Sequence, residues 1–318
     1  MWQLFIEQIE LKYIYHKLMA LPNFIISGFP KCGTTSLHYY LSEHPEIYMP
    51  DQKELHFFTN KIFSDENKGA GDSILAKTHI KNLKNYQKCF EKGKKYRIIG
   101  ETSPSYINYP KLFPKISKTL SNPKIIVLIR DPIKRAYSNY LHLLREQRET
   151  LSFEEALKQE EIRKALKYAD FWYYKFNSTY YKKISKAIEV FSNVLIITQE
   201  ELSQEPRQTI KKTYEFLEAD PEFKPKSLTK TYNPGGVYKK NIVTSLIFKP
   251  SLAKNILKRA VPVRPWMKDK LNGILARHKS SSQKINNKTQ KYLINYFRKE
   301  VEEIKKLGID TSRWNDYN

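Results

Sequence analysis

The stretch Gly28 to Ser36 reads Gly-Phe-Pro-Lys-Cys-Gly-Thr-Thr-Ser. It follows the short apolar run Phe24-Ile25-Ile26, which is typical of a buried strand in a parallel sheet. Apolar residues then recur at helical spacing, and His44-Pro45 ends the pattern, so a helix is predicted from Thr34 to Glu43. A glycine-containing turn between a buried strand and a helix directs backbone N–H groups at an anion. The sequence therefore predicts a phosphate-binding loop.

The position of the lysine separates this loop from the common nucleoside triphosphate loop. Four residues separate Gly28 from Gly33, as in a Walker A loop, but there the lysine follows the second glycine. Here Lys31 lies inside the loop and supplies a positive charge, while hydroxyls after Gly33 donate to phosphate oxygens. Because the lysine is displaced, Mg²⁺-triphosphate chemistry is less favoured. A single terminal phosphate that carries a transferable group fits better.

A second signature follows the most apolar predicted strand, Lys124–Ile129. It reads Arg130-Asp131-Pro132-Ile133-Lys134-Arg135-Ala136-Tyr137-Ser138-Asn139-Tyr140. Open α/β sheets bind ligands at the carboxyl ends of their strands, which is where Arg130 is expected. Ser138 is about two turns into the next predicted helix. These two side chains can converge on one phosphate.

Short apolar runs alternate with longer amphipathic segments along the rest of the chain. This alternation predicts an α/β fold, a single domain with a central parallel sheet flanked by helices and a P-loop-like phosphate-binding loop. We assign the domain to residues 22–318 and an N-terminal helical extension to residues 1–21. Further strands are predicted at Ile47-Tyr48, Arg97–Gly100 and Asn193–Thr198. Further helices are predicted at Trp2–Met19, Asp131–Arg148, Phe171–Val190, Pro206–Glu218 and Asn287–Leu307, with another capped by Ser152 and Glu155 and a loop at Lys226–Lys240.

The charge balance favours an anionic partner. The 318 residues are 40% hydrophobic, enough for one large α/β domain, and 56 Lys plus Arg against 33 Asp plus Glu give a net charge of +23. Such a field favours nucleic acid, anionic lipid, phosphorylated cofactors or acidic polysaccharide. The abundance of Lys, Asn, Ile and Tyr is equally expected from a genome of biased base composition, so the charge alone does not choose among these.

The two signatures together resemble those of sulfotransferases that use 3′-phosphoadenosine 5′-phosphosulfate (PAPS). The heparan sulfate N- and 3-O-sulfotransferases and their bacterial relatives are the most similar groups. The resemblance runs from about Phe24 to Trp314, including the closing Tyr-Leu-Ile-Asn-Tyr-Phe helix and the final Ser-Arg-Trp. Each motif alone is moderately specific, whereas both in this order form a strong signal. On this resemblance residues 22–318 are a sulfotransferase domain.

The resemblance implies where the donor binds. The 5′-phosphosulfate would lie on the loop, and the 3′-phosphate on Arg130 and Ser138. Tyr238, in the segment Asn233–Lys239, would contact the nucleotide. No metal would be required. The loop residues implied in donor binding are Lys31, Cys32, Gly33, Thr34, Thr35 and Ser36.

The segment Asp51 to Phe58 resembles the family sequence Glu-x-His-Phe-Phe, whose glutamate is the proposed general base. On that match Glu54 would take the proton from an acceptor hydroxyl or amine. His56 is two residues further on, so on a strand it would share the face of Glu54 and supply a supporting hydrogen bond. Lys31 would stabilise charge on the leaving oxygen during in-line transfer.

Other positions depart from the resemblance. Thr102 stands where the 3-O enzymes carry a lysine, which puts their acceptor in doubt. The acceptor is expected to be a glycan or glycolipid, and its identity cannot be read from the sequence. The basic and aromatic stretch Phe171 to Lys183 would either line a sugar cleft or form a core helix with a solvated lysine face.

The location is expected to be cytoplasmic, as for a soluble bacterial-type enzyme, with peripheral membrane association as the alternative. Cys32 and Cys89 form no disulfide framework or metal motif, and the cysteines that staple the Golgi enzymes are missing. Charges at Glu7, Glu10 and Lys12 interrupt the N-terminal apolar residues before a membrane span could form.

Two other functions compete with sulfate transfer. The glycine spacing also suits a P-loop kinase or NTPase, although the displaced lysine and Arg130 argue against it. The charge suits a nucleic-acid binder, but no helix-turn-helix or zinc signature supports one, so nucleic acid is not an expected partner. The oligomeric state cannot be read from the sequence.

Overall fold

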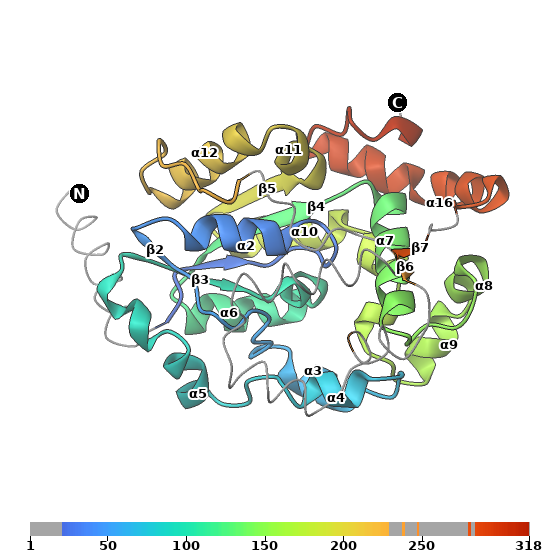
Figure 1. The fold of residues 1–318 in the computed structure, drawn as a ribbon, viewed down its shortest axis with the longest axis horizontal. Coiled ribbons are helices and arrows are strands. Elements are labelled where there is room, and N and C mark those ends of the chain that lie inside the picture. The colour runs from blue at the N-terminus through green and yellow to red at the C-terminus, as the bar shows by residue number, and fades with distance from the viewer. Residues whose placement is uncertain (1–20, 229–236, 239–246, 248–278, 281–283, 318) are drawn as a thin grey trace.

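The computed structural model describes residues 21–228, 237–238, 247, 279–280 and 284–317 (Figure 1). At its centre lies a sheet with the strand order β2-β3-β1-β4-β5. All neighbouring strands in this sheet are parallel, so the predicted α/β class is confirmed. The strands are β1 (Phe24–Ile26), β2 (Ile47–Tyr48), β3 (Ile98–Thr102), β4 (Lys124–Ile129) and β5 (Val194–Thr198).

Helices connect the strands and cover the sheet. In Figure 1, α11, α12 and α16 lie along one border of the molecule and α3, α4 and α5 along the opposite border, with the sheet between them. A short antiparallel pair, β6 (Val237–Tyr238) with β7 (Lys279–Ser280), lies beside α7. The helices are α2 (Thr34–Ser42), α3 (Asn60–Asp65), α4 (Asp72–Ala76), α5 (Leu83–Lys88), α6 (Phe113–Thr119), α7 (Pro132–Arg145), α8 (Phe153–Lys158), α9 (Glu160–Ala165), α10 (Tyr181–Val190), α11 (Gln199–Gln204), α12 (Pro206–Leu217) and α16 (Asn287–Lys306).

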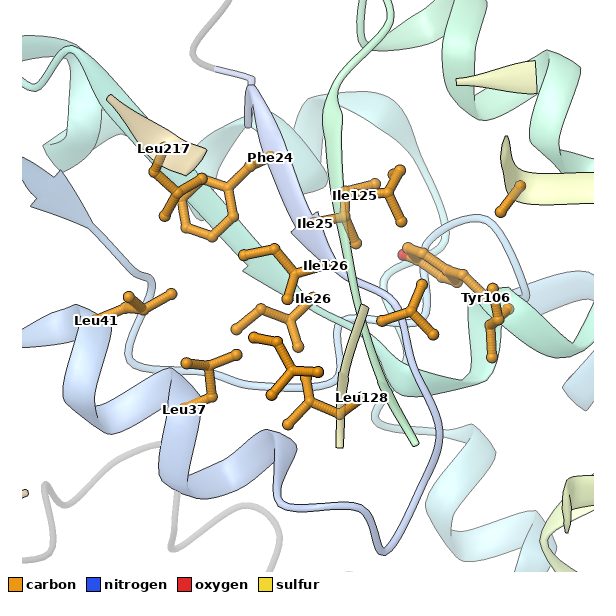
Figure 2. Close-up of a cluster of buried hydrophobic side chains, with 14 of the residues drawn as sticks. Phe24, Ile25, Ile26, Leu37, Leu41, Tyr106, Ile125, Ile126, Leu128 and Leu217 are labelled. Carbon is orange, nitrogen blue, oxygen red and sulfur yellow. The ribbon is translucent and has the colours of Figure 1, made fainter. Parts of the chain in front are cut away.

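The core is built on both faces of β1 and β4. Consecutive strand residues point to opposite faces of a sheet, and all three residues of β1 are buried. Figure 2 shows Phe24 and Ile26 on the side of Leu37 and Leu217, while Ile25 lies toward the opposite side. Burial on both faces explains why these strands read as unbroken apolar runs in the sequence.

The helix predicted from Phe171 to Val190 is wrong in its first half. Two 3₁₀ turns, Asp170–Trp172 and Phe176–Ser178, come first, and α10 begins only at Tyr181. The Asn177 side chain donates to the carbonyls of Asp170 and Tyr173 at 2.6 and 2.9 Å. Side-chain hydrogen bonds of this kind compete with the helical pattern, and the apolar periodicity did not report them.

The other expected elements are found with small shifts. The helix predicted to reach Arg148 ends at Arg145, because Gln147 adopts a left-handed backbone with φ 58°. The capping box of Ser152 and Glu155 is present. The predicted N-terminal helix Trp2–Met19 and most of the loop Lys226–Lys240 lie outside the described residues. The domain boundary at residue 22 stays a prediction.

Gly28 is the position at which the first strand must pass against β4. A Cβ atom there would lie 2.5 Å from Cγ1 of Val127 and 2.7 Å from the backbone N of Leu128. We therefore expect Gly28→Ala to destabilise the protein by about 1–3 kcal/mol or more, because neither neighbour belongs to a flexible side-chain end. Thermal unfolding checks this, with the exposed Gly308→Ala as control, although its φ of +75° carries its own strain. An unchanged melting temperature for Gly28→Ala would contradict the close approach.

Candidate active site

The loop between β1 and α2 has the backbone of an anion site. Gly33 is the N-cap of α2 at φ 95°, and Lys31 is left-handed at φ 72°. No side chain caps this helix. The first N–H groups of a helix, here those of Thr34, Thr35 and Ser36, have no acceptor within the helix and suit an anion.

The side chains of the loop differ in what they offer. Cys32 is buried, and burial raises the pKa of its thiol to about 12, so it contributes backbone and packing and not a thiolate. Thr34 is also buried. The hydroxyl of Thr35 accepts a hydrogen bond of 2.6 Å from the ammonium of Lys53. Of the three hydroxyl residues at the start of α2, Thr34 is therefore buried, and Ser36 is half-buried.

Arg135 holds the loop against α7 through a hydrogen bond. It is fully buried on α7, and its Nε donates to the carbonyl of Pro30 at 3.0 Å. Its other nitrogens donate to the Tyr174 carbonyl and to the Asn139 side chain. The sequence motif contained Arg135, but its pattern did not reveal that this residue ties the loop to α7.

The two residues implied for the 3′-phosphate, and Tyr238, implied for the nucleotide, belong to segments around the loop and α7. Nη1 of Arg130 lies 3.5 Å from the Lys31 carbonyl, and its buried Nε has no partner among the described residues. Ser138 is half-buried on α7. Tyr238 belongs to β6, which lies beside α7. The structure thus brings Arg130 to the loop and the strand of Tyr238 to the helix of Ser138.

Lys31 reaches α7 with its side chain. Its Nζ lies 3.3 Å from Nδ1 of His142, and Nε2 of His142 lies 3.3 Å from the Glu146 carboxylate. Burial, followed by the charge of Arg145, lowers the pKa of Lys31 to about 7. Burial and Lys31 lower the pKa of His142 to about 4, so the imidazole is neutral at pH 7 and accepts at Nδ1. No motif or spacing in the sequence pointed to His142.

The segment of Glu54 is not a strand, the conformation in which His56 was expected to share the face of Glu54. Glu54 and His56 are both left-handed, at φ 56° and 52°. The segment is held along the end of β3, since the Glu54 N–H donates to the Thr102 carbonyl at 2.8 Å. The expected pairing is nevertheless present, with His56 Nε2 3.8 Å from Glu54 Oε2 and His56 Nδ1 2.9 Å from the Ser105 hydroxyl.

Glu54 is ionised in this environment. Burial acts to raise the pKa of its carboxyl group, but the neighbouring His56 and the Lys53 ammonium outweigh burial and lower the pKa to about 2. The side chain lines a cavity, and 51% of its surface is accessible. A carboxylate that is ionised and accessible can accept a proton from a bound acceptor.

Lys53 joins the Glu54 segment to the loop and was not singled out from the sequence. Its 2.6 Å bond to Thr35 connects the residue before Glu54 to the first turn of α2. Burial lowers the pKa of its ammonium. Its only sequence signal was its place directly before Glu54.

Thr102 contributes no charge to the site. It is buried at the end of β3, and its hydroxyl lies 2.9 Å from Nδ1 of His38. Its neighbour Glu101 is also buried and accepts from Ser103 and Tyr106 at 2.6 and 2.8 Å. This carboxylate therefore orders the turn that follows β3.

A cavity of about 380 Å³ opens next to Glu54. It touches the loop at Pro30 and the end of α7 at His142, and it reaches α4 and the turn containing Phe171 on its other sides. Its lining residues are Pro30, Lys53, Glu54, His56, Phe63, Glu66, Asp72, Leu75, Ala76, Thr78, His79, Pro104, Ser105, His142, Glu146, Arg148, Ala169, Asp170 and Phe171.

The stretch Phe171 to Lys183 mostly packs in the core. Trp172, Tyr174 and Tyr180 are buried. Lys183, expected on a solvated face, is buried and donates to the Asn108 side chain at 3.1 Å, so that expectation is wrong. Phe171, at the start of this stretch, lines the cavity.

Among the described residues, no group of three or more His, Cys, Asp or Glu side chains is arranged to hold a metal ion. In the same part of the chain, no helix has the length and apolar character needed to cross a membrane.

The fold and site together define a class of α/β proteins in which an anion-binding loop after the first strand faces an ionised carboxylate across a cavity. Residues 22–223 match the model of the sulfotransferase family, so the chain belongs to that family. The family expected from the two sequence signatures is thereby confirmed, and a P-loop kinase or NTPase is not favoured.

Individual relatives match parts of the chain. The membrane-associated sulfotransferase kil1 of Dictyostelium discoideum is 38% identical over 124 residues, 39% of this chain and 23% of that protein. Human heparan sulfate glucosamine 3-O-sulfotransferase 5 is 32% identical over 138 residues, 43% of this chain and 34% of that protein. Human carbohydrate sulfotransferase 15 is 32% identical over 158 residues, 40% of this chain and 28% of that protein. The matched regions thus span about a third or less of these relatives.

A solved structure matches nearly the whole chain. The sulfotransferase of Alicyclobacillus acidocaldarius superimposes with a TM-score of 0.71 at 28% identity, covering 92% of this chain and 98% of that one. The single α/β domain with its parallel sheet is therefore a sulfotransferase fold.

Proposed function

We propose that this protein transfers a sulfuryl group from PAPS to a hydroxyl or amine of an acceptor, with Glu54 as the general base. The observation that carries the proposal is that one cavity touches both the phosphate-binding loop, at Pro30, and the accessible carboxylate of Glu54. A donor held on the loop would present its transferable group to an acceptor in that cavity.

The donor would be bound by the loop and its surroundings. The N–H groups at the start of α2 and the ammonium of Lys31 suit the 5′-phosphosulfate. Arg130, Ser138 and Tyr238 are proposed for the 3′-phosphate and the nucleotide. The buried, unpartnered Nε of Arg130 supports this role, since a buried donor normally has an acceptor.

The reaction would proceed by in-line displacement at sulfur. The acceptor oxygen or nitrogen forms a bond to sulfur as the bond from sulfur to the bridging phosphate oxygen breaks. Glu54 takes the acceptor proton, and His56, held by Ser105, supports the carboxylate. Lys31 stabilises the charge that develops on the bridging oxygen. The products are the sulfated acceptor and 3′-phosphoadenosine 5′-phosphate (PAP).

A carbohydrate acceptor, as a free glycan or a glycolipid, is the proposed partner. Two of the relatives are named as heparan sulfate or carbohydrate sulfotransferases, which supports a sugar hydroxyl or amine as the nucleophile. The cytoplasmic location stays a prediction, and one relative is named as membrane-associated.

Radiolabelled sulfate transfer from PAPS, measured in EDTA with a panel of glycans, lipids and phenols, tests the activity. We expect transfer to a sugar acceptor without added Mg²⁺. Failure of PAP to bind in calorimetry would contradict the proposal. Mg²⁺-dependent ATP hydrolysis that survives Arg130→Ala would instead support a P-loop NTPase.

Arg130 should determine the preference for a 3′-phosphate. We expect Arg130→Ala to weaken PAP binding by about 10- to 100-fold, because a hydrogen bond to a charged group contributes about 1.5–3 kcal/mol. Binding of adenosine 5′-monophosphate, which lacks the 3′-phosphate, should be nearly unaffected. Calorimetry with both ligands checks this, with the exposed Lys134→Ala on α7 as control. Equal weakening of both ligands would show that Arg130 does not read the 3′-phosphate.

A further inference from the structure

The cavity beside Glu54 lies on the acceptor side of the site. Of the residues proposed for the donor, none lines it, and the loop reaches it only through Pro30. The rest of its wall comes from α3, α4 and the segment around Phe171, and we call this part the far wall. If the proposed function is correct, the acceptor binds against this wall. The chemical character of the wall side chains therefore indicates which acceptors fit.

The charge of the cavity lining is opposite in sign to the net charge of the chain. The chain carries +23, yet among the described residues that line the cavity the acidic side chains outnumber the basic ones. Of its three imidazoles, His79 has a pKa lowered by burial to about 3 and His142 one lowered to about 4, so both are neutral at pH 7. The acidic side chains are Glu54, Glu66, Asp72, Glu146 and Asp170, and the basic ones are Lys53 and Arg148.

Both basic side chains already interact with other side chains of the protein. Arg148 forms a buried ion pair with Asp72 and reaches the carboxylate of Glu146 at 3.2 Å. Lys53 donates to Thr35 and lies beside Glu54 in the chain. Within the described part of the chain, an anionic group on the acceptor would therefore meet no lining cation that lacks a partner.

Asp72 of the far wall is paired with Arg148, whereas Glu66 and Asp170 form no ion pair among the described residues. Within the described residues, Glu66 forms neither an ion pair nor a side-chain hydrogen bond, and it lines the cavity beyond α3. Burial and then repulsion by Asp170 raise the pKa of Glu66, against the smaller opposing effects of Lys111 and Lys167. Asp170 accepts from the amide of Asn108 at 2.8 Å. A cationic or hydrogen-bond-donating group would relieve this repulsion, whereas an anion would add to it.

The rest of the wall is apolar and the space is small. Phe63, Leu75, Ala76, Pro104 and Phe171 line it. A volume of about 380 Å³ is at the lower end of the range for small-molecule sites. It suits a compact group with an apolar part.

We propose that the group presented to Glu54 is compact, partly apolar and free of anionic substituents, such as the neutral or amino-sugar head of a glycolipid. A polyanionic glycan is not the acceptor. The anionic donor bound next to the cavity strengthens this selection, because a second anion would be repelled by both the donor and the far wall.

A matched pair of probes tests the charge preference. Octyl β-glucoside and octyl β-glucuronide share the ring and the alkyl chain and differ in one carboxylate. We expect the protein saturated with PAP to bind the glucoside about tenfold or more tightly than the glucuronide in calorimetry. Equal or tighter binding of the glucuronide, or of a desulfated heparan chain, would overturn the inference, and so would binding of neither probe.

A variant assigns the preference to the far wall. Glu66→Lys should lower the ratio of the glucoside association constant to the glucuronide association constant by about tenfold. Its affinity for PAP should be unchanged. Asp65→Asn is the control, since this carboxylate is adjacent in the chain but exposed and outside the lining. An unchanged ratio in Glu66→Lys would overturn the assignment. Absence of PAP binding to the wild-type protein would instead overturn the proposed function. A failure of the charge preference and a failure of the proposed function are therefore distinguishable.

Discussion

Replacing Glu54 with glutamine is expected to lower kcat by about 10²–10⁴-fold and to leave PAP binding unchanged. The amide keeps the shape of the side chain but cannot take a proton from the acceptor. The backbone bond from Glu54 to Thr102 does not depend on the side chain, so the segment should keep its position. Steady-state sulfate transfer and calorimetric titration with PAP measure the two effects separately.

The control for this variant is Asp51→Asn, which removes an exposed carboxylate from the same segment. Its turnover should stay near the wild-type value. If Glu54→Gln also turned over at the wild-type rate, the base would have to lie elsewhere in the cavity, with Glu146 as the next carboxylate beside Lys31.

The pH dependence follows from the same environment. A pKa lowered to about 2 means that Glu54 is a carboxylate throughout the ordinary pH range. A carboxyl group whose pKa is depressed in the folded state stabilises the fold above its unfolded pKa, and this contribution is lost as the pH falls through about 2. In the free enzyme Glu54 should therefore cause no loss of kcat/KM between pH 5 and 7.

The parts of the site that could be predicted from the sequence are those with local signals. Gly28 and Gly33 mark a strand–loop–helix unit because close approach to β4 and a positive φ demand glycine there. The apolar runs of β1 and β4 give the buried strands. These signals act over a few residues, which a single sequence displays directly.

The parts that could not be predicted depend on contacts between distant segments. Lys31 meets His142 across 111 positions, and Arg135 holds the Pro30 carbonyl across 105. The pairing of Glu54 with His56 was expected for a wrong reason, since two left-handed residues and not a strand bring them together. No periodicity encodes such contacts, because tertiary packing and not local propensity selects them.

Lys31 should couple donor binding to proton uptake. In the protein alone, burial and Arg145 lower its pKa to about 7, so above pH 7 much of the ammonium is deprotonated. A phosphate or phosphosulfate beside it favours the charged form and raises the pKa. PAP binding at pH 8 should therefore take up close to one proton, which calorimetry in buffers of different ionisation enthalpy measures. The association constant should be flat below pH 7 and fall by about tenfold per pH unit above it, until the pKa of the complex is reached.

The variant Lys31→Met should remove both the proton uptake and the stabilisation of the leaving oxygen. We expect kcat to fall by about 10²–10³-fold, the size found for loss of one donor to a developing negative charge. Lys134→Met, an exposed lysine of α7, should change neither quantity. Proton uptake that persisted in Lys31→Met would assign it to Lys53 or His142, whose pKa values burial also lowers. An unchanged kcat would show that the displaced lysine binds the donor without acting on the bond that breaks.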